Sequence, residues 1–375
     1  YRMKEDYPVR RTEDVLATMP GIIVVGLLIG GLAASLQKWG NPPNMGICVA
    51  CFTRDIAGAL GLHRAAAVQY LRPEIPAFCL GAFIAALAFR EFRPRTGSAP
   101  VVRFMLGMFA MIGALVFLGC PWRAMLRLAG GDWNALVGLA GLIVGIAVGV
   151  QFLKFGFNLG RSYPTRKLAG LAMPFLMLVL LVLAIWYPHA GDNAALFRTV
   201  KPAEAAATPP GAAHAAVWVS TLVALAIGFL AQRTRFCTVG GLRDVILMRD
   251  FHLLSGVLGF LVAAFLMNLL YSQFHPGLAG QPAAHTNHWL NFGGMALAGL
   301  SFTLAGGCPG RQVFLSGEGD ADAAMFVLGM LTGAAVAHNF LMVGAAKLAA
   351  PMVIAGLIIV GLIGILGREK LAPAR

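Results

Sequence analysis

Long uninterrupted runs of apolar residues are the strongest constraint in this sequence. The runs are about 20 residues long, which is the length that an α-helix needs to cross a hydrocarbon core of about 30 Å. Because no water is available there, a spanning segment must satisfy its own backbone hydrogen bonds, and a helix does so. The composition agrees: 58% of the 375 residues are hydrophobic and 12% are charged, against about 25% charged residues in soluble domains. We therefore predict an all-α polytopic membrane protein that resides in a lipid bilayer.

The apolar runs predict about ten transmembrane helices, five on each side of a linker. The linker, residues 188–213, is rich in Ala and Pro and separates a first half, residues 1–187, from a second half, residues 214–375. The predicted spans lie near residues 15–37, 73–90, 102–119, 133–155, 166–187, 214–233, 252–273, 291–306, 321–346 and 350–366. Glycine is abundant, with 46 residues, which favours close helix packing and broken helices in a membrane bundle.

Lysine and arginine are distributed unevenly between the two predicted sides of the membrane. The N-terminus, with Arg10 and Arg11, and every second loop carry 20 of them, and the alternate loops carry 9. Because positive charge favours the cytoplasmic side, we predict that both termini are cytoplasmic in a multi-pass protein of the bacterial inner membrane. The same distribution assigns the net charge of +13 to membrane topology and argues against a nucleic-acid partner.

Two motifs occur twice at nearly the same offset. The first has Cys followed six positions later by Arg-Asp, and it occurs as Cys48 with Arg54-Asp55 and again, 189 residues later, as Cys237 with Arg243-Asp244. The second is Gly-Cys-Pro-x-Arg closed by Gly-Asp. It occurs as Gly119-Cys120-Pro121-Trp122-Arg123 with Gly131-Asp132 and again, 188 residues later, as Gly307-Cys308-Pro309-Gly310-Arg311 with Gly319-Asp320.

These offsets indicate that the chain contains a duplication. Five predicted spans separate equivalent points, and an odd number gives the two halves opposite orientations in the membrane. We therefore predict two inverted repeats with pseudo-two-fold symmetry, an architecture in which substrate passes at the repeat interface. The halves are not identical, because the first carries an insertion around Asn41-Pro42-Pro43-Asn44 just before Cys48.

The Gly-Cys-Pro motif predicts helix starts inside the membrane. Proline is favoured at the first helical position, so Cys120 and Cys308 are expected as N-caps of short half-helices, and the four motif segments predict four short re-entrant half-helices. A helix N-terminus presents unpaired N–H groups and positive charge, which suit an anion. A neutral thiol there is a weak S–H donor to a soft partner, and a reactive thiolate is the alternative.

Repeated arginines in membrane-entering motifs need an explanation, because a charge at the bilayer centre costs about 2.5–3.5 kcal/mol on insertion scales. Either they pair with the motif aspartates and brace the fold, or they attract an anion. The arginines are Arg54, Arg123, Arg243 and Arg311, and the aspartates are Asp55, Asp132, Asp244 and Asp320.

Cys48 and Cys51 form a CxxC pair, which can signal redox chemistry or metal binding. The second half has Gly240 at the position equivalent to Cys51, so the repeat does not preserve the pair. We therefore predict no metal and no cofactor, and Cys51 is a secondary candidate for the substrate path.

The motif segments resemble the YeeE/YedE family of sulfur-transport membrane proteins over nearly the whole chain. The residues that carry the likeness are the runs 40–64 and 69–75, Gly119-Cys120-Pro121, 127–132, 232–235 and 241–244, and they are most similar to the YedE subgroup assigned to selenium transport. The resemblance implies an hourglass-like bundle in which Cys48, Cys120, Cys237 and Cys308 relay thiosulfate by S–H hydrogen bonding. It also implies a small cytoplasmic sulfur-carrier protein as a partner.

We therefore expect a transmembrane transporter or pore for a small inorganic sulfur or selenium species, and not an enzyme. Two alternatives stay open. One is a membrane sulfurtransferase that forms a persulfide or selenosulfide on Cys48 or Cys237, and the other is a generic inorganic-anion channel with structural cysteines. The sequence contains no GxxxxGK[ST] nucleotide-binding loop, which argues against ATP-driven transport by this chain alone.

Overall fold

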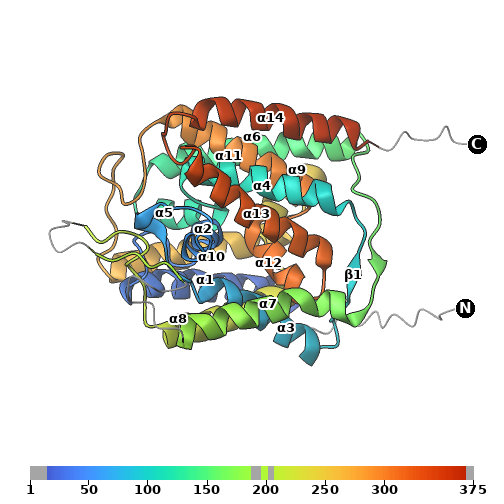
Figure 1. The fold of residues 1–375 in the computed structure, drawn as a ribbon, viewed down its shortest axis with the longest axis horizontal. Coiled ribbons are helices and arrows are strands. Elements are labelled where there is room, and N and C mark those ends of the chain that lie inside the picture. The colour runs from blue at the N-terminus through green and yellow to red at the C-terminus, as the bar shows by residue number, and fades with distance from the viewer. Residues whose placement is uncertain (1–14, 187–195, 202–206, 369–375) are drawn as a thin grey trace, which may run out of the picture.

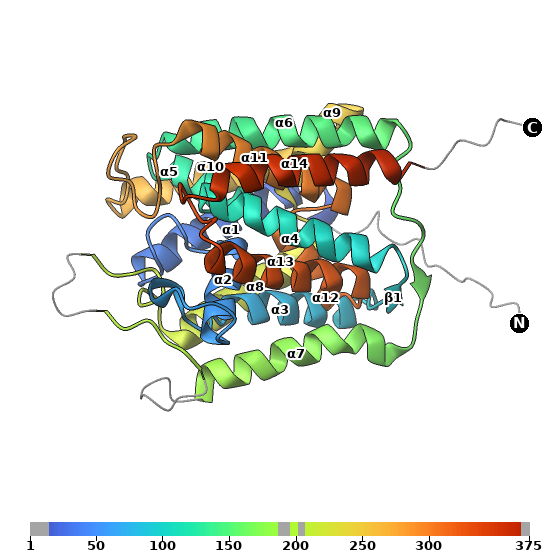
Figure 2. The same ribbon diagram turned by 45° about the horizontal axis from the view of Figure 1, so that its top comes forward.

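The apolar runs form a bundle of long helices with four short helices among them (Figure 1). The structure is a computed structural model and describes residues 15–186, 196–201 and 207–368. Parts of the predicted linker 188–213, both ends of the chain and the residues Arg10 and Arg11 therefore lie outside the described residues. The long helices run side by side along the longest axis of the molecule, and Figure 2 shows the same arrangement after a 45° turn.

The order of long and short helices is the same in both halves. The first half contains α1 (Met19–Lys38), α2 (Val49–Ala59), α3 (Glu74–Ala88), α4 (Pro100–Phe117), α5 (Pro121–Ala129), α6 (Asn134–Lys154) and α7 (Lys167–Trp186). The second half contains α8 (Val217–Thr234), α9 (Thr238–Met248), α10 (His252–Leu270), α11 (His288–Ala305), α12 (Pro309–Gly317), α13 (Ala321–Asn339) and α14 (Ala349–Leu366). The other described elements are the 3-10 helices η1 (Val15–Ala17) and η2 (Ala66–Val68) and the antiparallel strands β1 (Arg95–Thr96) and β2 (Tyr163–Pro164).

The predicted membrane class is confirmed by helix length and composition. Within the described ranges, 9 helical segments are long and apolar enough to cross a membrane. The one predicted span that is not among these nine, 73–90, corresponds to α3, a shorter apolar helix of 15 residues. The span predicted at 321–346 is shorter in the structure. Helix α13 ends at Asn339, and Leu341 takes a left-handed φ of 54°, through which a right-handed helix cannot continue.

Helices from the two halves interdigitate. Helix α1 packs on α10 and α3 on α8, while α6 packs on α11 and α4 on α13. By their order in the two halves, α1 is equivalent to α8, α3 to α10, α4 to α11 and α6 to α13. The α1–α10 pair is therefore equivalent to the α3–α8 pair, and the α6–α11 pair is equivalent to the α4–α13 pair. This pairing is what a duplicated two-fold arrangement predicts, and the opposite orientation of the two halves stays a prediction.

Glycines bring the backbones of these helix pairs into direct contact. A Cβ on Gly30 of α1 would lie 2.1 Å from the carbonyl oxygen of Phe260, and one on Gly228 of α8 would lie 2.2 Å from that of Phe78. Small residues allow this approach where apolar burial cannot drive helices together. The close contacts hold α10 and α3 in place, and both helices contribute fully buried phenylalanine rings to the centre of the bundle.

We predict that Gly30→Ala destabilises the fold by about 1–3 kcal/mol, because overpacking a tight contact costs that much. The matched control is Gly31→Ala on the same helix, since the nearest atom to a Cβ there is Met267 Cγ at 3.9 Å. Thermal unfolding of the purified protein in detergent should show a lower melting temperature for the first variant only. Equal melting temperatures would contradict the close-contact interpretation.

Candidate functional site

Each of the four short helices begins directly after a motif cysteine. The N-cap residues are Cys48 for α2, Cys120 for α5, Cys237 for α9 and Cys308 for α12. The prediction that Cys120 and Cys308 are N-caps is therefore confirmed, and the structure adds Cys48 and Cys237, for which no N-cap position was predicted. Three of the four sulfurs accept a hydrogen bond from the N–H three residues ahead, at 3.3 Å from Cys51, 3.2 Å from Gly240 and 3.5 Å from Arg311. The Cys120 sulfur makes no such bond.

Left-handed residues explain why two long helices stop inside the bundle. The C-cap residue of helix α4 is Leu118, with φ 67°, and that of α11 is the equivalent Gly306, with φ 90°. The left-handed conformation suits glycine, whereas it costs another residue roughly 1–2 kcal/mol. Each break is followed by Gly-Cys-Pro, so the chain turns once and starts a new helix with a thiol at its beginning.

The four thiols form two pairs, one in each half. In the first thiol pair, the sulfurs of Cys48 and Cys120 lie 3.8 Å apart. In the second thiol pair, the backbone N–H of Cys308 points to the sulfur of Cys237 at 3.4 Å. All four thiols are free and buried. The secondary candidate Cys51 lies beside the first pair, with its sulfur 3.8 Å from the carbonyl oxygen of Leu118.

The indole of Trp122 connects the two thiol pairs. Trp122 follows Cys120 by two residues, and its ring lies 5.8 Å from that of Phe236, the residue before Cys237. It also fills the space above Gly310, where a Cβ would lie 3.0 Å from indole Cζ2. Gly310 is the repeat equivalent of Trp122. The indole N–H is buried and donates to no protein atom. Sequence reasoning missed this residue, although the Trp–Gly difference between the two motif copies was a visible signal.

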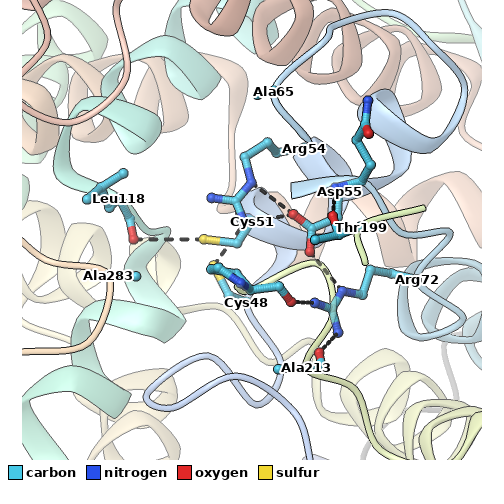
Figure 3. A network of polar contacts seen from close by, with 12 residues as sticks. Cys48, Cys51, Arg54, Asp55, Ala65, Arg72, Leu118, Thr199, Ala213 and Ala283 are labelled. Carbon is cyan, nitrogen blue, oxygen red and sulfur yellow. Dashed lines mark hydrogen bonds and ion pairs between the residues drawn. The ribbon is translucent and has the colours of Figure 1, made fainter. Parts of the chain in front are cut away.

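Asp55 is the centre of a buried ion network in the first half (Figure 3). Arg54 donates to Asp55 Oδ1 from Nε at 2.9 Å and from Nη2 at 2.7 Å, and Arg72 Nε donates to Asp55 Oδ2 at 2.8 Å. Arg72 also donates to the carbonyl oxygens of Pro210 and Ala213. The network thus fastens α2 to the segment that leads into the second half.

The other motif charges pair in a less regular way. Arg243 pairs with Asp244 at 2.8 Å, as the Arg54–Asp55 pair does in the first half. Two aspartates take arginines outside the repeated set, Asp132 with Arg127 at 2.6 Å and Asp320 with Arg95 at 2.7 Å. Arg311 pairs with Glu318 at 3.1 Å, whereas Arg123 has no ion pair with any carboxylate in the described part of the chain.

The paired residues Arg72, Arg127, Arg95 and Glu318 were not singled out from the sequence. Arg127 and Asp132 stand in one motif segment and Glu318 directly precedes Gly319-Asp320, so proximity in the chain was the available signal. For metal binding, no cluster of three or more His, Cys, Asp or Glu suited to an ion occurs among the residues that the structure describes.

We predict that Asp55→Asn destabilises the protein by about 3–5 kcal/mol, since it leaves two buried arginines without a counter-charge. The matched control is Asp244→Asn at the equivalent position. There the Arg243 side chain is 25% exposed, and solvent screens the pair. Melting temperatures in detergent should fall much further for Asp55→Asn, and equal losses would contradict the ranking.

Comparison with known proteins shows similarity to sulfur transport proteins. Residues 233–361, which contain the second thiol pair, match the family model described as Sulphur transport. The thiosulfate transporter TsuA of Spirochaeta thermophila is 32% identical to the chain over 103 residues, which are 28% of this chain and 31% of TsuA. The matched segment therefore spans less than a third of that relative. These two findings confirm the resemblance seen in the motifs: the chain is similar to the YeeE/YedE family of sulfur transport membrane proteins.

Proposed function

We propose that this protein carries a small sulfur oxyanion of the thiosulfate class, or its selenium analogue, across the membrane by way of the two thiol pairs. The observation that carries the proposal is the position of the four cysteines, each at the N-cap of a short helix and each paired with a second thiol. The sulfur transport family and the thiosulfate transporter relative support the choice of cargo.

The N-cap bonds do not use the thiol protons. The sulfurs of Cys48, Cys237 and Cys308 accept backbone hydrogen bonds through their lone pairs, and the Cys48 S–H points to the Cys120 sulfur, so a substrate that enters this pair takes the place of a weak thiol–thiol contact. A thiol is a weak donor, and several weak sites in sequence allow an ion to enter and to leave again. The soft terminal sulfur of thiosulfate, or selenium in its place, suits such polarisable partners.

The indole of Trp122 packs against four phenylalanine rings beside the thiol pairs. Its rings, together with Phe78, Phe236, Phe260 and Phe314, are fully buried. Since the four thiols are buried as well, an anion reaches them only when side chains move aside. A relay therefore proceeds from one pair to the other in separate steps.

We predict that Cys120→Ala lowers thiosulfate uptake by about ten- to a hundredfold, the value of one hydrogen bond to a charged group. This variant tests the relay most directly, because the Cys120 sulfur makes no cap bond that α5 would lose. Uptake of labelled thiosulfate is measured in proteoliposomes. The control is Cys79→Ala, a buried cysteine on α3 that contacts Ser316 and lies outside the motifs.

The second thiol pair needs a variant that preserves its cap. Cys308→Ser keeps an N-cap oxygen for the Arg311 N–H and replaces the thiol with a hard donor, so uptake should fall while the melting temperature is maintained. If both Cys120→Ala and Cys308→Ser transport at the wild-type rate, the relay is wrong.

Substrate preference should follow the softness of the anion. In proteoliposomes we expect thiosulfate to enter faster than sulfate, because sulfate has the same charge and shape but offers only hard oxygen atoms to the thiols. Selenite and hydrogen selenide, measured in the same assay, test whether selenium species are accepted. Equal rates for thiosulfate, sulfate and chloride would indicate a generic anion channel with structural cysteines.

A further inference from the structure

One arginine of the repeated motif has an ion-pair partner in the second half but not in the first. Arg123 and Arg311 are repeat equivalents, 188 residues apart. Arg311 pairs with Glu318 at 3.1 Å. The position equivalent to Glu318 in the first half is Gly130. Within the described ranges Arg123 therefore lacks the carboxylate that its counterpart has.

Backbone carbonyl groups surround Arg123 in place of a carboxylate. Its Nε donates to the carbonyl oxygen of Asn44 at 3.3 Å, and its Nη2 donates to those of Ala283 at 3.1 Å and Pro282 at 3.4 Å. Its Nη1 donates to the carbonyl of Leu118. The side chain is fully buried. Carbonyl dipoles satisfy the N–H groups, but they leave the positive charge itself without a counter-ion, which is costly in a buried site.

The surrounding buried charges do not compensate for Arg123. Beside it, Arg127 is matched by Asp132, and Arg54 and Arg72 share the single carboxylate of Asp55. Glu74 is buried as well and accepts from Asn41 at 2.8 Å. Counting all of these groups, four buried arginines stand against three buried carboxylates. The region at the α2 and α5 end of the bundle thus holds one more arginine than carboxylates, and the nearest other ionisable group to Arg123 is the thiol of Cys51, 3.6 Å from its Nη1.

An open cavity lies directly beside this charge. Its volume is about 230 Å³, and its lining includes Gln37, Asn44, Gly130, Gln273, Gln281 and Pro282. Asn44 and Pro282 are also carbonyl partners of Arg123, so one layer of backbone separates the guanidinium from the cavity. No lining residue carries a carboxylate. At about 30 Å³ per water, the space accommodates an anion with part of its hydration shell.

The cavity wall contains amide groups without protein partners. Gln37 Nε2, Gln273 Oε1 and Gln281 Oε1 are shielded from solvent and make no hydrogen bond with any residue that the structure describes. Gln37 is held in place because its Oε1 accepts from the backbone N–H of Asn44 at 2.5 Å. A buried polar atom without a partner is costly, and a small movement of the cavity wall brings the free Gln37 donor to an oxyanion oxygen and the two free acceptors to the water that accompanies the ion.

We propose that this cavity is a capture site for a divalent tetrahedral oxyanion, which it holds before the ion reaches the thiols. This inference rests on the proposed transport function, and it adds a binding step that precedes the contact of the anion with the thiols. Arg123 supplies the attracting charge and Gln37 an amide donor. Arg123 Nη1 also lies 3.6 Å from the sulfur of Cys51, one helical turn from Cys48, so the site leads to the first thiol pair. Because no thiol lines the cavity, it binds sulfate and thiosulfate alike, and selection for sulfur takes place afterwards.

The repeat itself suggests the variant that tests this site. A Cβ on Gly130 would lie 2.2 Å from Asn44 Oδ1, so Gly130→Glu needs Asn44→Gly beside it. Asn44 has a φ of 57°, which glycine adopts without strain. The double change restores the Arg–Glu pair of the second half and neutralises Arg123. The double variant Asn44→Gly with Gly130→Gln has the same volume and lacks only the charge.

The experiment is equilibrium binding of radiolabelled sulfate and of radiolabelled thiosulfate to the purified full chain in detergent. We expect the wild type to bind both ions, and the Glu double variant to bind each at least about tenfold more weakly than the Gln double variant, since only the carboxylate competes for the arginine. Melting temperatures establish that both double variants are folded.

Three outcomes would overturn the capture site: thiosulfate binding without sulfate binding, equal affinities in the Glu and Gln variants, or loss of sulfate binding in Cys120→Ala. The last variant also separates this inference from the relay. If Cys120→Ala abolishes uptake but the Glu and Gln double variants bind sulfate equally well, the relay stands and the capture site is wrong. If the Glu double variant binds both ions more weakly than the Gln double variant and Cys120→Ala transports normally, the capture site stands and the relay is wrong.

Discussion

Two long helices end inside the bundle, and the rest of the site depends on how their last carbonyl groups are satisfied. At the end of α4, Arg127 donates to the carbonyl of Phe117 at 2.8 Å and Arg123 donates to that of Leu118. At the end of α11, Arg103 and Gln312 both donate to the carbonyl of Ala305 at 3.1 Å. A buried helix end without such partners would be unstable, and positive side chains also favour the negative end of the helix dipole. The buried arginines therefore stabilise the helix ends, independently of any role in binding substrate.

Repeat-equivalent positions of the two halves hold different residues around the thiols. Equivalent positions hold Trp122 and Gly310, so one indole occupies space that two symmetric side chains could not share. Equivalent positions also hold Gly130 and Glu318, so one arginine is paired and the other is not. The insertion before Cys48 brings Asn44 against Gly130 and Arg123. Departures from the repeat thus gather around the thiols, while the helix pairs that carry the bundle keep the symmetric pattern.

Much of the fold could be predicted from the sequence because the physics involved is local. Apolar runs of spanning length required helices, and Gly-Cys-Pro indicated a break followed by a new helix start, so the N-cap positions of Cys120 and Cys308 were predicted from the sequence. Ion pairing was harder to predict. The Arg54–Asp55 and Arg243–Asp244 pairs are adjacent in the chain, and the structure contains both. Asp132 and Asp320 instead bind Arg127 and Arg95, because their partners depend on how the short helices pack.

By itself, the sequence predicted a bundle of membrane-spanning helices with two copies of two cysteine motifs, and it predicted Cys120 and Cys308 at the beginnings of short helices. Those features follow from hydrophobicity, backbone geometry and spacing, which act over one helix or one turn. Only the tertiary structure decided which thiols are neighbours, which arginine lacks a carboxylate and where a cavity opens beside it. These depend on contacts between segments such as Asn44, Arg123 and Pro282, whose distance in space is set by the packing of the whole bundle and not by their separation in the chain.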